Sequence, residues 1–132
     1  MADLNTALKK LNLGLCMILF MVTSGTLFSQ TTHNDLAGTW ERNVQGTTLS
    51  IVFDKDGGYQ VEFTGDGITD VTGQCKIEKD RITFNDTGGM AADEPGVYSF
   101  KIENDKITFG IINDPSNGRS GLLAGIWTRK NE

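Results

Sequence analysis

The chain has 132 residues, a length that fits a single domain. Its 17 acidic and 12 basic residues give a formal net charge of −5, and no basic cluster follows residue 29. Contacts to nucleic-acid phosphates need Lys and Arg, so this balance argues against binding to nucleic acids and to anionic membranes.

The first 29 residues have the layout of a secretory signal. Lys9 and Lys10 form a short basic region, residues 13–22 are apolar, and small and polar residues follow up to Ser29. The apolar run has about ten residues, whereas a membrane-spanning helix needs about 20. We therefore expect a bacterial signal helix, residues 1–29, that is cleaved to leave Gln30 at the new N-terminus. The alternative is an uncleaved anchor that gains length from residues 23–28.

Cleavage would leave a secreted or periplasmic chain with a flexible linker, residues 30–36, and a folded domain, residues 37–132. Cys75 is then the only cysteine, so an intramolecular disulfide cannot form despite the oxidising compartment. The fold must rest on its apolar core, in which we expect Cys75 to act as a small buried hydrophobe. A reactive or dimer-forming thiol is the alternative.

Short alternating segments follow residue 37, and turns rich in glycine and aspartate separate them, which is typical of β-strands. No stretch has the sustained 3.6-residue apolar period of a helix, so no helix is expected in the domain. The pattern predicts eight strands, at residues 38–44, 47–54, 59–64, 69–78, 81–85, 97–103, 106–112 and 122–130.

Tight hairpins join most of these strands, which favours an up-and-down order over Greek-key crossings. The expected fold class is all-β: a small eight-stranded antiparallel up-and-down barrel after the N-terminal signal helix, with a sandwich as the alternative. Eight strands enclose an interior just wide enough for packed side chains or one small ligand. Alternation on the third, sixth and seventh strands predicts these inward side chains: Tyr59, Val61, Phe63, Tyr98, Phe100, Ile102, Ile107, Phe109 and Ile111.

Both ends of the domain carry a tryptophan motif. Gly38-Thr39-Trp40 opens the first strand, and Trp127-Thr128-Arg129 ends the last. The pair resembles the lipocalins of the calycin superfamily, in which the indole of a Gly-x-Trp covers one end of the barrel and an arginine of the final strand stacks over it. The resemblance implies that Gly38, Trp40 and Arg129 form a structural signature at the closed floor. Alternation with Arg129 places Trp127 on the floor side too.

The chain also resembles small bacterial secreted proteins described as lipocalin-like, over essentially the whole domain. The matching motifs are Asp56-Gly57-Gly58-Tyr59, Pro95-Gly96-Val97-Tyr98, Asp114 with Arg119, and the closing tryptophan motif. The hairpin has one glycine more than the family pattern, and residues 115–117 stand where the family often has a loop cysteine. The superfamily resemblance implies binding of a small, mostly apolar molecule.

The two longest loops, residues 86–95 and 113–120, are the expected mouth of the barrel, because loops on a rigid scaffold often carry binding sites. Asp114 and Arg119 are expected to pair and order the second loop, with a ligand contact as the alternative. The inward aromatic side chains could instead fill the interior by themselves. The candidate ligand-binding residues are Tyr59, Phe63, Tyr98, Phe100, Phe109, Asp114 and Arg119.

No catalytic set, metal site or cofactor is expected. His33 is the only histidine, and it lies in the predicted linker. Asp54, Asp56 and Gly58 suggest a calcium loop, but its third oxygen ligand and distal glutamate are missing. A hairpin turn is the preferred interpretation of these residues.

The sequence therefore favours a non-catalytic exported protein that binds a small apolar molecule in or at the mouth of a barrel. An interaction module with a filled barrel is the main alternative. A minimal barrel isomerase or cyclase would need ionisable groups inside the barrel, and alternation places Glu62, Lys76 and Lys101 outside. An avidin-like binder would need further internal tryptophans. No nucleic-acid partner, and no membrane after signal cleavage, is expected.

Overall fold

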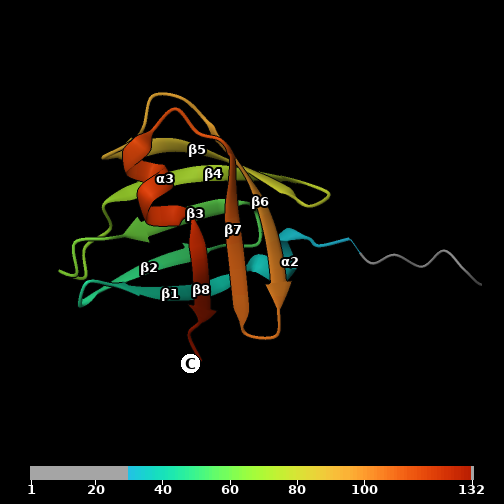
Figure 1. Cartoon of the computed structure of the whole chain (residues 1–132), viewed down its shortest axis with the longest axis horizontal. Helices are drawn as coiled ribbons and strands as arrows, with labels where there is room; N and C mark the ends of the chain where they lie inside the picture. Colours follow the sequence, from blue (N-terminus) through green and yellow to red (C-terminus); the bar gives the residue numbers. More distant parts are fainter. Residues whose placement is uncertain (1–29, 132) are drawn as a thin grey trace, which may run out of the picture. The chain divides into compact units, whose positions relative to one another are not determined.

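The computed structural model describes residues 30–131, in which eight antiparallel strands close into a barrel in sequence order (Figure 1). The predicted all-β barrel is confirmed. The strands are β1 (Gly38–Val44), β2 (Thr47–Phe53), β3 (Gly58–Glu62), β4 (Val71–Glu78), β5 (Arg81–Gly89), β6 (Gly96–Glu103), β7 (Lys106–Asn113) and β8 (Gly125–Arg129). Two short helices, α2 (His33–Leu36) and α3 (Asn117–Leu123), complete this part of the chain, and neither has the length and apolar character to span a membrane.

Tight turns connect three of the strand pairs, as their sequences predict. Gln45, Lys79 and Asn104 begin these turns with φ of 52°, 57° and 54°. Two-residue hairpin turns favour this left-handed conformation because it matches the twist of the paired strands. β1 and β8 then close the ring, with Trp40 opposite Arg129.

The expectation that the domain has no helix is wrong, and the strand boundaries shift accordingly. Residues 117–123 form α3, so the last strand begins at Gly125 and not at residue 122. The hydroxyl of Ser116 accepts the N–H of Arg119 at 3.2 Å and caps the helix. β5 runs on to Gly89, which shortens the expected loop at 86–95.

Alternation fills the packed part of the interior with aromatic rings around Phe84. Tyr59, Tyr98 and Phe109 meet this ring edge-on, with centroids 5.3, 5.6 and 5.6 Å away, and Phe53 lies at 6.2 Å. Each such aromatic pair adds about 0.5–1.5 kcal/mol to the burial of its surface. Cys75 is buried in the same core, as expected, and burial raises the pKa of its thiol to about 12, with a smaller contribution from Asp54.

One predicted inward residue points elsewhere. Ile111 is 54% exposed. The pairing of β6 with β7 shifts between Val97 and Tyr98, which lie opposite Asn113 and Ile111. Ile112 is therefore an extra residue in β7, and such a bulge breaks the alternation of faces.

The chain contains a duplicated segment that joins a short helix to a strand at each end of the barrel. Residues 36–42 and 123–129 both have the sequence Leu-Ala-Gly-x-Trp-x-Arg. The leucine of each copy is the last residue of a short helix. In each copy the indole N–H of the tryptophan donates to the leucine carbonyl four residues earlier, at 2.9 Å. Each glycine has a strongly positive φ, 124° at Gly38 and 122° at Gly125.

The arginine of each copy binds the helix end beside the other copy. Arg129 donates to the carbonyls of Ala37 and Asp35, at 2.9 and 2.8 Å, so it binds the end of α2. Arg42 donates to the carbonyls of Leu122 and Ala124 at the end of α3. The guanidinium groups thus satisfy carbonyls that a helix end leaves without partners.

The floor of the barrel matches the expectation for Trp40 and Arg129. The guanidinium of Arg129 lies 4.2 Å from the centroid of the Trp40 ring, within the range of a cation–π contact. The predicted linker at 30–36 needs correction, because α2 lies within it and Leu36 is fully buried. The predicted signal, residues 1–29, lies outside the described residues.

Candidate functional site

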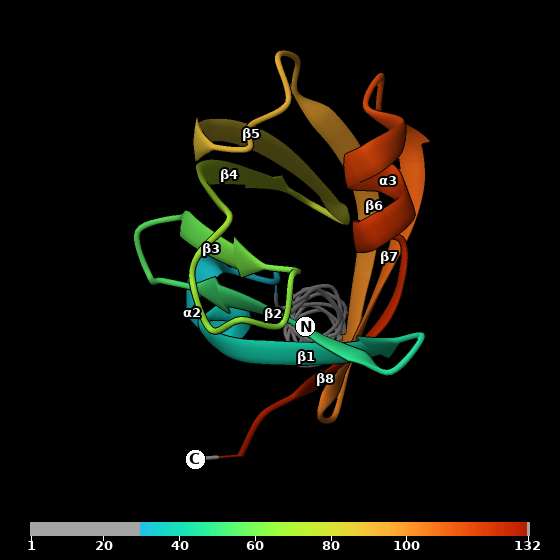
Figure 2. The ribbon, with the colours of Figure 1, turned by 90° about the vertical axis from the view of Figure 1, so that its left-hand side faces the viewer.

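A cavity of about 370 Å³ lies at the end of the barrel where α3 packs, opposite the Trp40 floor. Figure 2 views the molecule from this side, with α3 on one side of the barrel end and β3 with the connection to β4 on the other. Most of the lining is apolar, and it comes from β3, β4, β5, α3, β8 and the loop after β5. The apolar lining residues are Tyr59, Val61, Phe63, Val71, Phe84, Met90, Ala91, Ala92, Leu122, Leu123 and Trp127.

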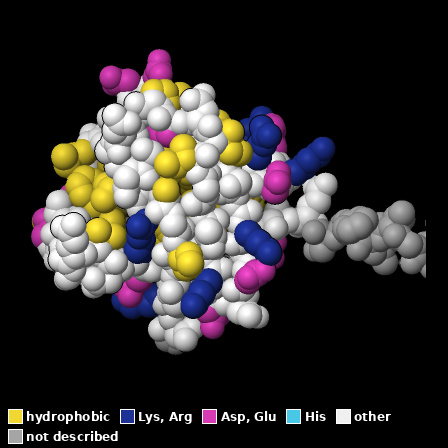
Figure 3. Space-filling model, viewed as in Figure 1, with side chains coloured by type: hydrophobic (Ala, Val, Ile, Leu, Met, Phe, Trp, Pro, Cys, Tyr) yellow, Lys and Arg dark blue, Asp and Glu magenta, His cyan; other side chains and the backbone are white. Residues whose placement is uncertain are grey.

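Exposed apolar side chains mark the edge of this cavity. Met90 is 69% exposed and lines the cavity. In Figure 3 apolar side chains gather on the left, the side on which α3 and the β3–β4 connection lie in Figure 1. The opening is thus apolar at its rim as well as within.

Trp127 belongs to this cavity and not to the floor. Its side chain is inward, as alternation with Arg129 predicts, but it lines the cavity beside Leu123. The reason is the direction of β8, which starts at α3 and runs towards the floor, so that Trp127 comes two residues before Arg129. The expected grouping of both tryptophans at the floor is therefore wrong.

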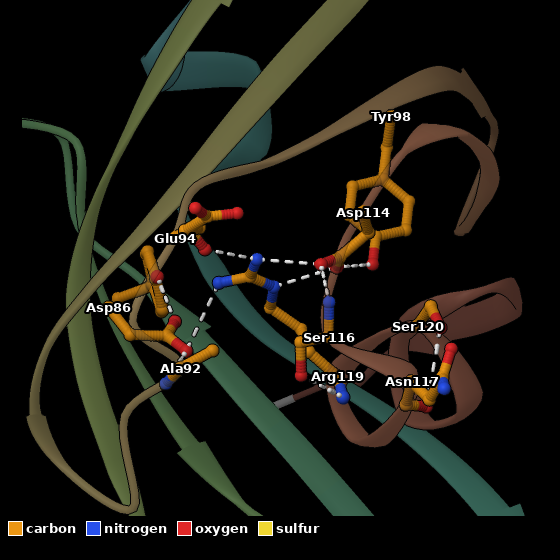
Figure 4. Close-up of polar contacts among 10 residues, drawn as sticks. Asp86, Ala92, Glu94, Tyr98, Asp114, Ser116, Asn117, Arg119 and Ser120 are labelled. Atoms are coloured by element: carbon orange, nitrogen blue, oxygen red, sulfur yellow. Dashed lines mark hydrogen bonds and ion pairs between the residues drawn. The ribbon is translucent and has the colours of Figure 1, made fainter.

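Arg119 of α3 is the centre of a buried polar network at the cavity wall (Figure 4). Its Nε and Nη2 donate to the two carboxylate oxygens of Asp114, both at 2.7 Å. Nη1 donates to Asp86 at 3.2 Å, and Nη2 also donates to the Glu94 carbonyl at 2.6 Å. The predicted pairing of Asp114 with Arg119 is present, and it extends to a second carboxylate on β5.

Two tyrosines complete the network. The hydroxyl of Tyr59 donates to Asp86 Oδ1 at 2.5 Å, and that of Tyr98 donates to Asp114 Oδ2. The backbone N–H of Ala92 donates to Asp86 at 2.9 Å and that of Ser116 to Asp114 at 2.8 Å. These bonds join β3, β5, β6, the loop after β5 and the loop before α3 around one guanidinium.

Burial and pairing set the charges of these groups. Burial alone would raise the pKa of Asp114, but bonds from Arg119, Tyr98 and the Ser116 N–H outweigh it and hold the pKa below its usual value. The bond to Asp114 raises the pKa of Arg119, which stays charged. Burial, followed by the bonds to Asp86 and Asp114, raises the pKa of Tyr59 and of Tyr98, so both phenols stay neutral donors.

The arrangement suits holding a molecule better than transferring protons. General acid–base groups have pKa values near the working pH, whereas the phenols of Tyr59 and Tyr98 are shifted away from it. Arg119 is bound to two carboxylates and a carbonyl, so its position is fixed by the protein. The network therefore stiffens one wall of an otherwise apolar cavity.

The structure divides the seven predicted ligand-binding residues into three groups. Tyr59, Phe63 and Arg119 line the cavity. Tyr98 and Asp114 lie behind the lining, where they hold Arg119. Phe100 and Phe109 are buried in the barrel and are not among the residues that line this cavity.

Asp86 is the charged lining residue that sequence reasoning missed. It was expected in a loop, yet it lies on β5 and its side chain is only 5% exposed. The signal was present, because Ile82, Phe84 and Asp86 follow one another at the two-residue spacing of an inward face. The ionisable groups that a barrel enzyme would need are thus partly present, contrary to the expectation of an interior without them.

Other polar groups that drew attention serve the turns. Asp54 accepts the N–H groups of Asp56 and Gly58, both at 2.8 Å, in agreement with a hairpin turn. Glu62, at the end of β3, clusters with Asp66 and Asp70 of the β3–β4 connection, and each of the three carboxylates accepts at least one backbone N–H of that connection. His33 packs against Gly57, and its Nδ1 has no hydrogen-bond partner among residues 30–131.

Comparison with known proteins leaves the geometry as the basis for assigning a function. No protein-family model, curated protein or solved structure matches the chain.

Proposed function

We propose that this chain is a non-catalytic, exported, lipocalin-like protein that binds a small apolar molecule in the cavity at the α3 end of its barrel. The observation that carries the proposal is the cavity of about 370 Å³ with its mostly apolar lining. Ligand sites are typically concave and apolar, have a few fixed polar groups, and have volumes of about a few hundred Å³.

The packed floor supports a ligand site at the other end only. Rings from five strands fill the space around Phe84, and Trp40 with Arg129 covers that end of the barrel. The lining of the cavity at the other end includes several small side chains, among them Val61, Val71 and Ala92. The sequence motifs of the lipocalin-like proteins and the secretory layout of residues 1–29 support the remaining parts of the proposal.

Filling the cavity tests the proposal. Val61 is buried on β3 and lines the cavity, so Val61→Phe should occupy the space a ligand needs. We expect the wild-type protein to bind N-phenylnaphthylamine, a neutral fluorescent probe, and Val61→Phe to weaken binding at least tenfold. Val52→Phe is the matched control, because Val52 is 41% exposed on the outer face of β2 and its replacement should leave the affinity unchanged.

Native mass spectrometry of the protein purified from its own host provides the second measurement. An additional mass on the wild-type protein, absent from Val61→Phe, is the expected result. Protein that is repeatedly recovered empty and does not bind the probe would contradict the proposal. It would favour the interaction module, for which Val52 on β2 and Ile126 on β8, 58% exposed, offer apolar contact points on the outer face.

A further inference from the structure

The network at the cavity wall contains more negative than positive charge. Two carboxylates, Asp86 and Asp114, pair with one guanidinium, Arg119. The three side chains are 5%, 0% and 7% exposed, so water screens them poorly. Because Tyr59 and Tyr98 are neutral donors, one negative charge of the network has no countercharge within it.

The hydrogen bonds show which carboxylate can receive a ligand. An ionised carboxylate has about four acceptor positions. Asp114 fills four, with Arg119 Nε, Arg119 Nη2, the Tyr98 hydroxyl and the Ser116 N–H. Asp86 fills three, with the Tyr59 hydroxyl on Oδ1 and with Arg119 Nη1 and the Ala92 N–H on Oδ2. The remaining position is on Asp86 Oδ1, and Asp86 lines the cavity whereas Asp114 does not.

Resting on the proposed function, we infer that the ligand is an apolar molecule with a hydrogen-bond-donating head, above all a protonated amine, which donates to Asp86 Oδ1. A cationic head would balance the surplus charge of the network. A neutral hydroxyl would take the open acceptor position without balancing the charge. The order of preference is therefore amine, then alcohol, then carboxylate.

A carboxylate head has no comparable place in this cavity. Arg119 has five N–H groups, and four of them are bound to Asp86, Asp114 and the Glu94 carbonyl. The fifth is on Nη1, beside the carboxylate of Asp86, which would repel an anion placed there. Among the described residues, the rest of the lining is mostly apolar and contains no second cationic side chain that could offset that repulsion.

A series of ligands that differ only in the head tests the inference. Octylamine, octanol and octanoate all have eight carbons in a linear chain, with the carboxyl carbon of octanoate included, and isothermal titration calorimetry of the full-length protein at neutral pH ranks their affinities. We expect octylamine to bind at least tenfold more tightly than octanol, and octanoate to bind most weakly. Both heads would donate to the carboxylate of Asp86, but only the ammonium adds an opposite charge, and a tenfold difference corresponds to about 1.4 kcal/mol.

Removing one charge shows whether Asp86 causes this order. Asp86→Asn should lower the affinity for octylamine about tenfold and bring the affinity for octanoate closer to that for octanol. Asp93→Asn is the matched control, because it removes the same charge from an exposed residue of the neighbouring loop and should keep the wild-type order. Tyr59→Phe keeps the charge of Asp86 and frees a further acceptor position on Oδ1, so it should retain or increase the preference for the amine. Any binding by the apolar residues 13–22 is common to all these proteins and cancels in the comparison.

Each result decides between the two proposals. Octanol and octylamine binding equally, or octanoate binding most tightly, would overturn the inference and leave the proposed function in place. Failure of all three molecules and of N-phenylnaphthylamine to bind would overturn both. If circular dichroism shows that Asp86→Asn is unfolded, the wild-type order and Tyr59→Phe decide the matter.

Discussion

Arg119 is a guanidinium buried in a small barrel, and such a group destabilises a fold unless its N–H groups are bonded. Here the bidentate bond to Asp114 comes from the loop before α3, and the third contact, to Asp86, comes from β5. The start of β6 lies close to this network, because a Cβ on Gly96 would be only 2.8 Å from Arg119 Nη2. The network therefore depends on a small residue at that position.

Acid should weaken the barrel through Asp114. Because the pKa of Asp114 is lower in the folded chain than its unfolded value of about 3.9, its contribution to stability is complete above that value. The contribution is lost as the pH falls through the folded pKa. We expect the unfolding free energy of the wild type to fall with pH below about 4, and the fall to be smaller in Asp114→Asn. Urea unfolding followed by tryptophan fluorescence at a series of pH values measures both.

The same variant should be less stable at neutral pH, by about 3 kcal/mol, because an amide accepts through one oxygen only and buried donors of Arg119, Tyr98 and Ser116 lose partners. Glu103→Gln is the control. Glu103 pairs with Lys101 at the surface, where both side chains are mostly exposed, so its replacement should leave the neutral-pH stability nearly unchanged. A wild-type pH dependence retained in Asp114→Asn would show that other groups cause the acid sensitivity.

At the scale of elements, the duplicated segment explains how a short helix is held at each end of the barrel. Each copy places a tryptophan inside the barrel, and each arginine binds the helix end that precedes the other copy. Gly38 and Gly125 are needed for two reasons, since each has a positive φ and each lies against the partner arginine, with 3.2 and 3.1 Å from a Cβ to the nearest guanidinium nitrogen. The copies share a geometry but face different surroundings.

Tryptophan-to-phenylalanine variants separate the contribution of each tryptophan to stability from its contribution to ligand binding. Trp40→Phe and Trp127→Phe each remove one indole N–H bond, to the carbonyls of Leu36 and Leu123. We expect each to lower the unfolding free energy by about 1–3 kcal/mol, measured by urea unfolding and circular dichroism. Only Trp127→Phe should also weaken N-phenylnaphthylamine binding, because only Trp127 lines the cavity.

The two variants are controls for each other, since they lose the same kind of bond. Equal losses of probe affinity would show that binding depends on overall stability and not on the cavity wall. A loss of affinity in Trp40→Phe alone would place the ligand at the floor.

At the scale of the whole molecule, the order of the strands and their inward faces follow from the sequence, because alternation has a strong local signal. The pattern on β2, with Leu49, Ile51 and Phe53 buried, is an example. The helices escape prediction because α3 has only seven residues, two of them glycines, and is held by Ser116 and Arg42. Such tertiary contacts have no signature in a local window.

The candidate site follows the same division. Tyr59 and Phe63 could be placed by alternation, and the pairing of Asp114 with Arg119 by their proximity in the chain. The contact between Asp86 and Arg119 spans 33 residues and requires the closed barrel to exist. Trp127 could be assigned to the inside, but its end of the barrel depends on where β8 begins.

Export can be tested on the whole chain, because the expected cleavage point lies just before the residues that form α2. The Thr32 N–H donates to Asp35 at 2.7 Å and starts α2, so cleavage between Ser29 and Gln30 would leave this contact in place. We expect protein expressed in a bacterium to reach the periplasm or medium and to begin with Gln30, as read by mass spectrometry of its N-terminal peptide. Replacing Leu15 and Leu19 with Arg should retain the intact chain in the cytoplasm, since a charged run is not an export signal. Intact wild-type chain found in the membrane fraction would instead support the anchor, in which residues 23–28 extend the apolar run.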